Sequence, residues 1–462
     1  MLVLLTHANH IHSDRKQLRK MQPYPPLQTL VAAAALRSNG IQVAFFDSTF
    51  DRDFRAVLER TRPDVLAVCE DNFNFLTKMC LLQNRELALE MARAAAEYGI
   101  PAIINSSDAT DHPDAYLAEG FHRVILGELE GSLSEFCRPG LDLGQDKRPL
   151  PGTAWREPDG RTVFGPPRPP ISDLDQLPPP AWDLMDMEPY RRAWKEAHGY
   201  FSLNLVSSRG CPYRCNWCAK PIYGGNYRHF SPDRIAADMQ RLKQMYRPDQ
   251  LWFADDIFGL SGKWTREFAD CVERRAAQIP FRIQSRCDLM TRDTVDALRR
   301  AGCAEVWMGA ESGSQRILDA MDKGIRVEDV HEARENLRRH GIRACFFLQF
   351  GYLGEEWGDI ESTIQLVRDT RPDDIGVSVS YPLPNTRFYD LVKNGIGKKA
   401  NWSDSGDLAK MFQGQFPTEF YHALADALHM EVRGTGSELD VRQAWKKVEQ
   451  LGAQAPRPVV RG

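Results

Sequence analysis

Short apolar runs alternate with longer amphipathic stretches along the first 138 residues of the chain. The apolar runs have the length of buried strands, and the stretches between them have helical periodicity and end at turn residues such as Asn39-Gly40 and Gly99. Strands that alternate with helices are typical of a doubly wound parallel sheet. The pattern predicts strands at residues 2–6, 43–47, 65–69, 102–105 and 124–126, and helices at residues 27–38, 54–61 and 85–98.

The same alternation returns between residues 201 and 381. Six strand–helix units in a row indicate a partial (β/α)6 TIM-like barrel, in which the active site lies at the carboxyl ends of the strands. The predicted strands are residues 201–207, 250–253, 281–285, 305–309, 344–349 and 376–381, and the predicted helices are residues 234–245, 266–278, 292–300, 327–340 and 357–369.

A proline-rich segment separates the two α/β regions. Ten prolines occur in the 32 positions from Pro149 to Pro180, which favours an extended, stiff linker, and Asp159-Gly160 predicts a hairpin turn between Trp155 and Val163. We therefore divide the chain into a doubly wound domain (1–138), a linker (139–195), a barrel (196–395) and a mostly helical C-terminal segment (396–462).

Composition narrows the possible partners. The formal charge of −4 gives no basic excess, so a nucleic-acid partner is disfavoured. No stretch reaches the roughly 18 uninterrupted apolar residues that cross a bilayer, so we expect no membrane partner and a cytoplasmic protein.

Three of the ten cysteines, Cys211, Cys215 and Cys218, lie in one loop after the first barrel strand. Thiolates at offsets of four and three can hold one iron–sulfur cluster and leave one iron open, and no fourth cysteine follows nearby. The alternatives are a zinc site completed by a distant histidine such as His229, or three structural thiols. We interpret the other seven cysteines, which are far apart in sequence, as small buried thiols.

Residues 202–386 resemble the radical S-adenosylmethionine (SAM) superfamily, and the three-cysteine loop is the most specific part of the match. The resemblance implies a [4Fe–4S] cluster on Cys211, Cys215 and Cys218, with Tyr213 or Trp217 as the aromatic residue of the loop. It also implies that the open iron chelates SAM. An electron from the cluster would then cleave SAM to methionine and a 5′-deoxyadenosyl radical, which abstracts hydrogen.

The resemblance extends to the ends of the later barrel strands. Glu311 and Ser312 match the segment that contacts SAM, and Arg228 matches a basic position that could face the methionine carboxylate. For the acidic residues, a helix cap or a salt bridge at the barrel rim is the competing interpretation. The cofactor-binding residues implied for the barrel are Arg228, Asp255, Asp256, Arg286, Glu311 and Ser312. The turn Gly351-Tyr352-Leu353-Gly354-Glu355 resembles a Gly-x-Pro-Gly-Glu turn, with Leu353 where proline is usual.

The N-terminal domain resembles the cobalamin-binding domain of cobalamin-dependent radical SAM enzymes. The matches are Pro25-Pro26-Leu27, the run from Asp108 to Pro113, and Gly127-Glu128-Leu129-Glu130, in which Leu129 departs from the family's Gly-Glu-Gly-Glu. No Asp-x-His-x-x-Gly motif occurs in this domain, so no lower axial histidine is implied. The residues implied are Asn72, Phe73 and Asn74 beneath the corrin, Ser106, Ser107 and Asp108 at its tail, and Gly127 and Glu128 at the fifth strand. The alternative is a degenerate domain that binds nothing.

These resemblances imply a cobalamin-dependent radical SAM methyltransferase that acts on a small-molecule biosynthetic intermediate and receives electrons from a donor such as flavodoxin or ferredoxin. A non-methylating enzyme similar to the anaerobic magnesium-protoporphyrin ester cyclase is the alternative with the same domains. An iron–sulfur electron carrier or cobalamin sensor is the non-catalytic alternative. A methylthiotransferase would use a second cysteine triplet, and the loops around Cys69, Cys80 and Cys137 do not resemble one.

Overall fold

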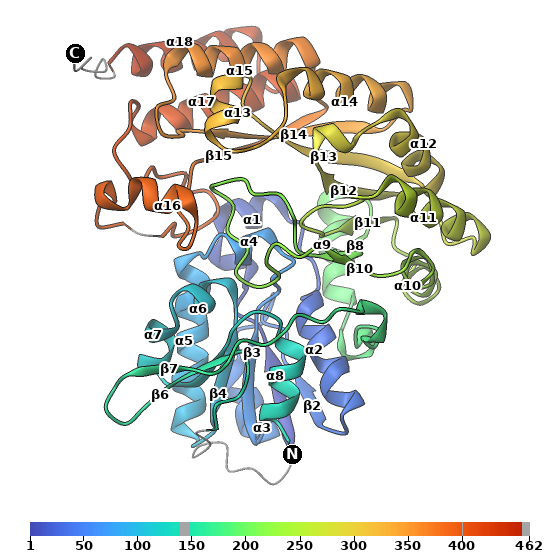
Figure 1. Cartoon of the computed structure of the whole chain (residues 1–462), viewed down its shortest axis with the longest axis vertical. Helices are drawn as coiled ribbons and strands as arrows, with labels where there is room; N and C mark the ends of the chain where they lie inside the picture. The colour runs from blue at the N-terminus through green and yellow to red at the C-terminus, as the bar shows by residue number, and fades with distance from the viewer. Residues whose placement is uncertain (139–147, 400, 455–462) are drawn as a thin grey trace. The chain divides into compact units, whose positions relative to one another are not determined.

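The computed structural model describes residues 1–138, 148–399 and 401–454 (Figure 1). The chain divides into two units. The first unit comprises Met1–Pro212, Lys220–Asp256 and Asn401–Gly406, within the described residues. The second comprises the described residues of Tyr213–Ala219, Ile257–Ala400 and Asp407–Gly462. Each unit is described by its own elements below.

The first unit contains a seven-stranded sheet with the strand order β2-β1-β3-β4-β5-β6-β7. The first five strands pair in parallel, which confirms the doubly wound sheet predicted from the alternating pattern. The strands are β1 (Leu2–Thr6), β2 (Gln42–Phe45), β3 (Val65–Cys69), β4 (Ala102–Asn105), β5 (Phe121–Ile125), β6 (Thr153–Arg156) and β7 (Thr162–Phe164).

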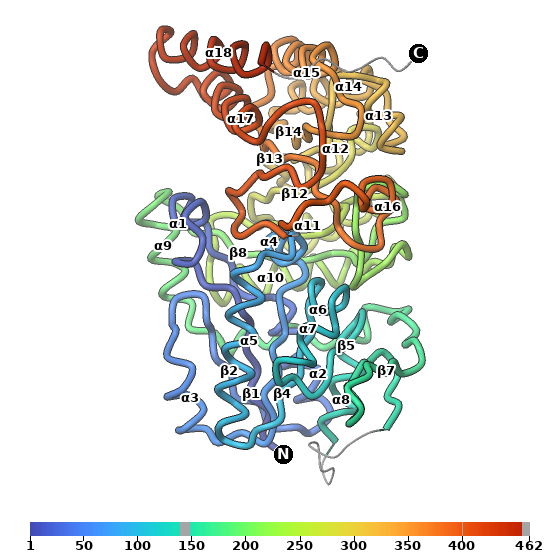
Figure 2. Tube along the Cα trace, turned by 90° about the vertical axis from the view of Figure 1, so that its left-hand side faces the viewer, coloured from blue at the N-terminus to red at the C-terminus, as the bar shows by residue number. Residues whose placement is uncertain are grey.

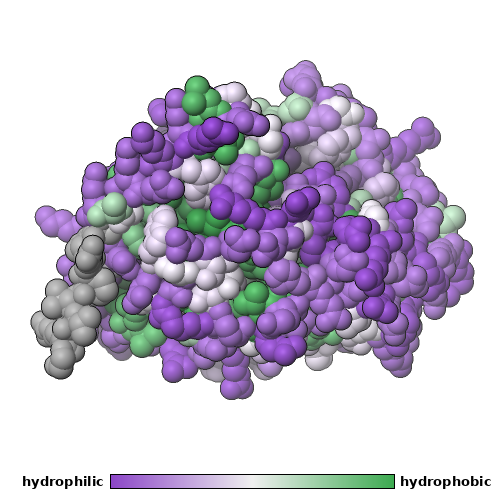
Figure 3. Space-filling model, turned by 90° about the horizontal axis from the view of Figure 1, so that it is seen from above, coloured by the Kyte–Doolittle hydropathy of each residue, from purple (hydrophilic) through white to green (hydrophobic). Residues whose placement is uncertain are grey.

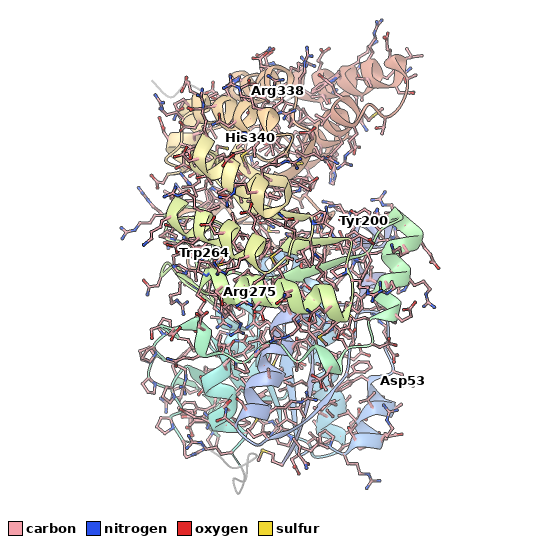
Figure 4. The ribbon with its side chains drawn as sticks, turned by 90° about the vertical axis from the view of Figure 1, so that its right-hand side faces the viewer. Asp53, Tyr200, Trp264, Arg275, Arg338 and His340 are labelled. Carbon is pink, nitrogen blue, oxygen red and sulfur yellow. The ribbon has the colours of Figure 1, made fainter. Side chains whose placement is uncertain are left out.

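Helices cover both faces of this sheet because alternate strand side chains point to opposite faces. Val3 and Leu5 pack with α2 (Leu27–Ser38) and α8 (Leu129–Phe136), which lie side by side (Figures 1 and 2). Leu4 of the same strand packs on the opposite core. That core is formed with α3 (Phe54–Thr61), α5 (Leu82–Glu97) and α7 (Pro113–Ala118). Asp53, labelled in Figure 4, begins α3 by accepting a hydrogen bond from the Ala56 amide at 3.2 Å.

The proline-rich segment contains secondary structure. Strands β6 and β7 form the predicted hairpin, with Trp155 opposite Val163, and β6 continues the sheet by antiparallel pairing with β5. Residues 139–147 of the predicted linker lie outside the described residues. The rest of the segment contains η2 (Leu174–Gln176), η3 (Trp182–Leu184) and most of α9 (Glu188–His198).

A second sheet has the strand order β15-β14-β13-β12-β11-β8, and the strand pairs given for it are parallel. Strands β8 and β11 belong to the first unit, and the four later strands belong to the second. This sheet is the predicted six-stranded half-barrel. Its strands are β8 (Ser202–Leu205), β11 (Gln250–Phe253), β12 (Phe281–Ser285), β13 (Cys303–Glu311), β14 (Arg343–Phe350) and β15 (Asp374–Val379).

Amphipathic helices follow the barrel strands. In α12 (Arg292–Ala301), Val295 and Leu298 are fully buried while Arg299 lies on the outward side. Trp264 and Arg275 mark the two ends of the helix after β11, and Arg338 and His340 mark the end of the helix before β14 (Figure 4). The remaining helices of this region are α10 (Pro232–Met245), α11 (Gly262–Arg274), α13 (Gln315–Ala320), α14 (Val327–Arg339), α15 (Trp357–Thr370) and α16 (Arg387–Val392).

The remaining short elements lie in the connections between the main strands and helices. They are η1 (Ile11–Ser13), α1 (Arg15–Lys20), α4 (Phe75–Lys78), α6 (Ser107–Asp111), β9 (Ser208–Arg209), β10 (Arg228–His229), η4 (Cys287–Leu289) and η5 (Lys393–Gly395). Several of them hold candidate site residues, because they directly follow the carboxyl ends of strands.

The C-terminal segment is helical, as predicted. Helix α17 (Thr418–Arg433) packs against β15 and also against α18 (Glu438–Ala453), as Figure 1 shows. Gly434, at φ +61°, permits the turn between these two helices. The face in Figure 3 is mostly hydrophilic, with apolar side chains in small separate groups. Within the described ranges, no helix combines the length and the apolar character needed to cross a bilayer.

Candidate active site

A tight turn begins the cysteine loop. Gly210 adopts φ +79°, and a side-chain carbon there would lie 2.5 Å from the carbonyl oxygen of Asn226, so only glycine fits without displacing backbone. The Cys211 amide donates to the Gly224 carbonyl at 3.3 Å, and Lys220 Nζ donates to the Cys211 carbonyl at 2.8 Å. These bonds fix the backbone at the first predicted ligand.

The three loop cysteines differ from the other seven in exposure. Cys211, Cys215 and Cys218 are half-buried, whereas the remaining seven are buried, as predicted for structural thiols. Burial raises the pKa of a thiol, and for Cys287 it does so to about 12. A thiol that stays protonated is a poor metal ligand. Exposure therefore selects the same three cysteines that the spacing selects.

Two buried cations stand near Cys215. Burial opposes the charge of Lys323, but Glu311 and then Cys215 raise its pKa above the ordinary value. Burial likewise opposes the charge of Arg286, and its pKa is still raised by Asp288, Tyr213 and Cys215. The Arg286 guanidinium lies 3.6 Å from the centroid of the Tyr213 ring. Positive charge at this place suits an anionic cluster held by three thiolates.

The donor set of the loop fits an iron–sulfur cluster. Three partly accessible thiols and two neighbouring cations supply the soft anionic ligands and the charge balance that such a cluster requires. Among the described residues, no group of three or more His, Cys, Asp or Glu is arranged to hold a single metal ion. His229, the residue named for the zinc alternative, has its Nδ1 2.9 Å from the carbonyl oxygen of Phe230.

Glu311 forms a buried ion pair at the carboxyl end of β13. Its Oε1 accepts a hydrogen bond from Lys323 Nζ at 2.7 Å, and each side chain is 6% exposed. Glu311 adopts φ +57°, an unusual value for a residue with a side chain. A side-chain carbon at Gly309 would lie 2.4 Å from both charged groups, so glycine at that position leaves the space that the pair fills.

Ser312 and Arg286 hold backbone around this pair. The Ser312 hydroxyl lies 3.1 Å from that of Thr363, which also accepts from the Gly313 amide at 2.9 Å. Arg286, at the carboxyl end of β12, donates to the Lys323 carbonyl at 2.9 Å and binds Asp288 at 2.9 Å. The structure thus brings the predicted Arg286, Glu311 and Ser312 into the unit that also contains Cys215.

The two aspartates after β11 are in different surroundings. Asp255 is buried and accepts hydrogen bonds from the Ser207 amide at 3.0 Å and hydroxyl at 2.8 Å, and also from the Ser208 hydroxyl. Burial raises the pKa of Asp255 to about 6. Asp256 instead pairs with Lys78, which ends α4. Asp255 therefore supports the chain that leads into the cysteine loop, and the cofactor role of both residues stays a prediction.

Arg228 is paired with a residue predicted for the other cofactor. Its guanidinium forms an ion pair with Glu128 and donates to the Ile171 carbonyl at 2.9 Å. Glu128 also lies 3.6 Å from Arg209 Nη1. Arg228 was assigned to SAM and Glu128 to cobalamin, so the structure joins the two candidate sets within the first unit.

The sequence interpretation did not identify Arg209. This arginine is 1% exposed and donates to Glu130 Oε1 at 2.6 Å, while its Nε has no hydrogen-bond partner among the described residues. Its guanidinium lies 5.2 Å from the Tyr223 ring centroid. A charged residue directly before Gly210-Cys211, after an apolar strand, was the available sequence signal.

Asn72 connects the loops after β3 and β4. It is fully buried, and its Oδ1 accepts from the Ser107 amide at 2.9 Å and hydroxyl at 3.0 Å. Its Nδ2 donates to the Glu70 carbonyl and to Asn105 Oδ1, both at 3.2 Å. The side chain of Asn72 is therefore committed to bonds that order these loops.

The other tail candidates also have partners within the chain. Asp108 binds Arg85 at 2.5 and 2.6 Å and accepts from the Tyr116 hydroxyl at 2.6 Å. Ser106 begins α6 by accepting from the Ala109 amide at 2.9 Å. These contacts place both residues at the carboxyl end of β4, where the sequence placed them, and a role toward a cofactor tail stays a prediction.

Phe73 and Gly127 complete this strand-end region. Phe73 stacks on Tyr223 with ring centroids 5.1 Å apart and an interplanar angle of 11°. Asn74 begins α4 by accepting from the Leu76 amide at 3.0 Å. Gly127 adopts φ +69°, and its carbonyl accepts from Asn105 Nδ2 at 3.0 Å. The predicted corrin-side residues thus share one edge of the first unit's sheet.

One family profile matches the part of the chain that contains the cysteine loop and most of the second sheet. The profile of the radical SAM superfamily matches residues 205–367, a span that includes all three loop cysteines and the strands from β11 to β14. Residues 205–367 therefore form a radical SAM domain.

The curated relatives are distant in sequence. An uncharacterized methyltransferase of Pyrococcus horikoshii is 27% identical over 281 residues, which are 60% of this chain and 60% of the relative. The anaerobic magnesium-protoporphyrin IX monomethyl ester cyclase of Rubrivivax gelatinosus is 24% identical over 87% of this chain and 71% of the cyclase. This chain thus spans about three fifths of the length of the first of these relatives.

Solved structures share the fold over most of this chain. OxsB, a cobalamin-dependent radical enzyme with aqua-cobalamin and SAM bound, has a TM-score of 0.73 and 16% identity over 97% of this chain and 70% of OxsB. The methyltransferase TsrM of Kitasatospora setae, with cobalamin and a [4Fe–4S] cluster bound, has a TM-score of 0.69 and 20% identity over 85% of this chain and 74% of TsrM. At these identities the likeness establishes the fold.

Proposed function

We propose that this chain is a cobalamin-dependent radical SAM methyltransferase that acts on a small-molecule biosynthetic intermediate. The observation that carries the proposal is the set of three half-buried thiols in one loop, with Arg286 and Lys323 charged beside Cys215. The fold shared with OxsB and TsrM and the methyltransferases among the curated relatives support it. A [4Fe–4S] cluster, SAM and cobalamin would together supply a carbon-centred radical and a transferable methyl group.

In this proposal each group of residues has a defined task. Cys211, Cys215 and Cys218 would hold the cluster as thiolates, and the buried cations Arg286 and Lys323 would balance its negative charge. Glu311 and Ser312, held by Lys323 and Thr363, present polar atoms at the end of β13 for SAM. The loops after β3, β4 and β5 hold cobalamin through backbone groups that Asn72 and Asn105 order.

Two further partners are part of the proposal. The cluster must be reduced before each turnover, so we expect an electron donor such as flavodoxin or ferredoxin. We also expect the protein to act in the cytoplasm, where a reducing environment keeps the thiols free.

The first test asks whether the loop binds a cluster that responds to SAM. Anaerobically reconstituted protein should show the spectrum of a reduced [4Fe–4S] cluster that changes when SAM is added. We expect Cys215→Ala to lose most of the bound iron. Cys271→Ala, which removes a buried thiol from α11, is the matched control and should keep it.

Turnover products decide between the catalytic alternatives. Production of S-adenosylhomocysteine together with 5′-deoxyadenosine supports methyl transfer. Deoxyadenosine alone would favour a cyclase-like reaction, such as that named for the Rubrivivax relative. A cluster that does not respond to SAM would refute the enzyme proposal and leave an electron carrier or sensor. Zinc in the loop of anaerobically purified protein would refute the cluster itself.

A further inference from the structure

A buried carboxyl group at the end of β14 has one oxygen without a partner. Glu355 is 4% exposed, and its Oε2 accepts a hydrogen bond from the Gly351 amide at 2.5 Å. Its Oε1 is buried and makes no hydrogen bond to any described residue. Such an atom is unusual, because buried polar atoms nearly always have partners. The Gly351 amide therefore provides a partner for one carboxyl oxygen of Glu355, and the other oxygen is left for a different partner.

Lys410 approaches the same carboxyl group from the segment before α17. Its ammonium group lies 4.9 Å from the Phe412 ring centroid and 5.6 Å from the Tyr421 ring centroid. Lys410 and Glu355 influence each other electrostatically, yet no hydrogen bond joins the ammonium group to a residue in the described part of the chain. The lysine is half-buried, which leaves a route to solvent.

Tyr421, on α17, brings a hydroxyl group to this place. Gly351 adopts φ +72°, and a side-chain carbon there would lie 3.1 Å from Tyr421 Cζ and 3.2 Å from its hydroxyl oxygen. The phenol thus packs against the residue whose amide binds Glu355. Like the ammonium group of Lys410, the hydroxyl makes no hydrogen bond to the described residues.

Aromatic packing behind the three groups keeps their surroundings apolar. Phe416 and Phe420 stack with ring centroids 4.3 Å apart, and both pack edge-on to Trp357 of α15. Burial raises the pKa of Glu355 to about 8 and lowers that of Lys410 to about 8. Near neutral pH the carboxyl and the ammonium group therefore both keep a proton, and the tyrosine hydroxyl is a third donor.

We propose that Glu355, Lys410 and Tyr421 form a binding site for an anionic oxygen group of the substrate, a carboxylate or a phosphoryl group, at the carboxyl end of β14. Three donors and one positive charge match such a group, since charge-assisted hydrogen bonds are the strong ones. The carboxyl ends of barrel strands are the side on which the active sites of this architecture lie. The identification of the ligand as substrate rests on the proposed function, whereas the site itself does not.

The test measures how fast an amine reagent modifies Lys410 in the full-length protein. Peptide mass spectrometry would follow acetylation at pH 7.5 in sodium phosphate, sodium acetate or sodium chloride of equal ionic strength. We expect phosphate or acetate to slow the labelling of Lys410 at least about threefold relative to chloride. Lys446, exposed on α18, is the internal control and should be labelled equally in all three salts.

The two probes separate the two ligand chemistries. Protection by phosphate alone assigns a phosphoryl group, protection by acetate alone assigns a carboxylate, and protection by both assigns a general oxyanion site. Equal labelling in all three salts would overturn the proposal and would leave Glu355 as a carboxyl group that holds only the Gly351 turn.

Variants identify the groups responsible. Tyr421→Phe keeps the ring against Gly351 and removes only the hydroxyl, and Glu355→Gln keeps an oxygen for the Gly351 amide. We expect Tyr421→Phe to lose most of the protection while Lys410 remains reactive. We expect Glu355→Gln to keep the protection, because its amide nitrogen still donates a hydrogen bond. Unchanged protection in Tyr421→Phe, or lost protection in Glu355→Gln, would contradict the three-group site even if Lys410 itself binds anions. Because no turnover is measured, the outcome is independent of whether the chain is a methyltransferase.

Discussion

Several buried charged side chains of this protein lie beside a group of opposite charge or beside hydrogen-bond donors. Lys323 faces Glu311, Arg209 faces Glu130, and Asp255 accepts hydrogen bonds from two serines. Removal of one partner lowers the stability of the folded protein, because the remaining charge stays buried without a partner. Stability measurements can therefore test whether these residues have the partners that the structure assigns.

We expect Lys323→Met to lower the free energy of unfolding by about 3–5 kcal/mol, the usual cost of leaving one member of a buried pair unpaired. Urea denaturation of the wild type and the variant would measure it. The matched control is Lys195→Met, which breaks an exposed pair with Asp249 and should cost no more than about 1 kcal/mol. Equal costs for the two variants would contradict the burial of the Lys323 pair.

The raised pKa of Glu355 predicts a pH dependence of stability. Its pKa is about 8 in the folded protein, so between about pH 5 and 8 the folded chain keeps a proton that the unfolded chain has lost. The free energy of unfolding must then fall as the pH rises through this range. The charged groups that face the carboxyl are Lys410, Asp359 and Arg316.

Glu355→Gln has no proton to lose, so we expect its stability to decline less steeply than that of the wild type from pH 5.5 to pH 8.5. Urea denaturation at three pH values in this range would measure the two slopes. Glu361→Gln, at an exposed position of α15, is the control and should run parallel to the wild type. Parallel slopes for Glu355→Gln as well would show that the carboxyl is not buried as described.

At the scale of elements, the loop after β13 packs directly against the backbone of α15. A side-chain carbon at Gly313 would lie 2.2 Å from the carbonyl oxygen of Ser362 and 2.8 Å from Thr363 Cα. The same loop contains Ser312, which bonds to Thr363. The helix therefore determines where the strand-end residues Glu311 and Ser312 lie, and any residue larger than glycine must displace it.

We expect Gly313→Ala to destabilise the protein by about 1–3 kcal/mol, because overpacking forces backbone shifts. Gly358→Ala, in the first turn of the same helix, has no atom within 4 Å of the added carbon and should instead stabilise the helix by about 0.5–1 kcal/mol. Denaturation midpoints of both variants would measure this difference. A change in stability in the same direction for both variants would contradict the close packing of the loop on α15.

At the scale of the whole molecule, the proposed cofactors predict a ligand-dependent stability. A ligand that binds only the folded state stabilises it in proportion to the logarithm of its concentration, by about 2.7 kcal/mol at one hundred times its Kd. We expect hydroxocobalamin to raise the thermal midpoint of the chain by several degrees in a saturable way. Riboflavin at the same concentrations is the control, and no shift with hydroxocobalamin would contradict cobalamin binding.

The local pattern of apolar and polar residues was sufficient to predict most elements. The predicted ranges 2–6, 27–38, 54–61, 65–69 and 102–105 coincide with observed elements, because each contains an apolar run of strand length or a helical repeat bounded by a turn residue. The strand predicted at residues 124–126 begins earlier, at Phe121, since the exposed His122 interrupts the apolar run. Helix α13 was not predicted because its six residues are too few for a periodic pattern.

Spacing was also sufficient for the three cysteines, since a loop of eight residues determines by itself which thiols can share a cluster. It was not sufficient for their surroundings. Lys323 and Arg209 gave no motif, because their importance depends on which distant carboxylates face them. Arg228 and Glu128 were assigned to different cofactors, and only folding showed that they pair.

The amino-acid sequence by itself determined the order of strands and helices, the two α/β regions and the cysteine loop, because these depend on neighbours along the chain. The tertiary structure decided which charges face each other and which polar atoms stay without a partner. Glu355, Lys410 and Tyr421 illustrate the difference, since they come from three separate segments and meet only when α17 packs against β15. Contacts between residues far apart in sequence depend on the packing of whole elements, which no local pattern records.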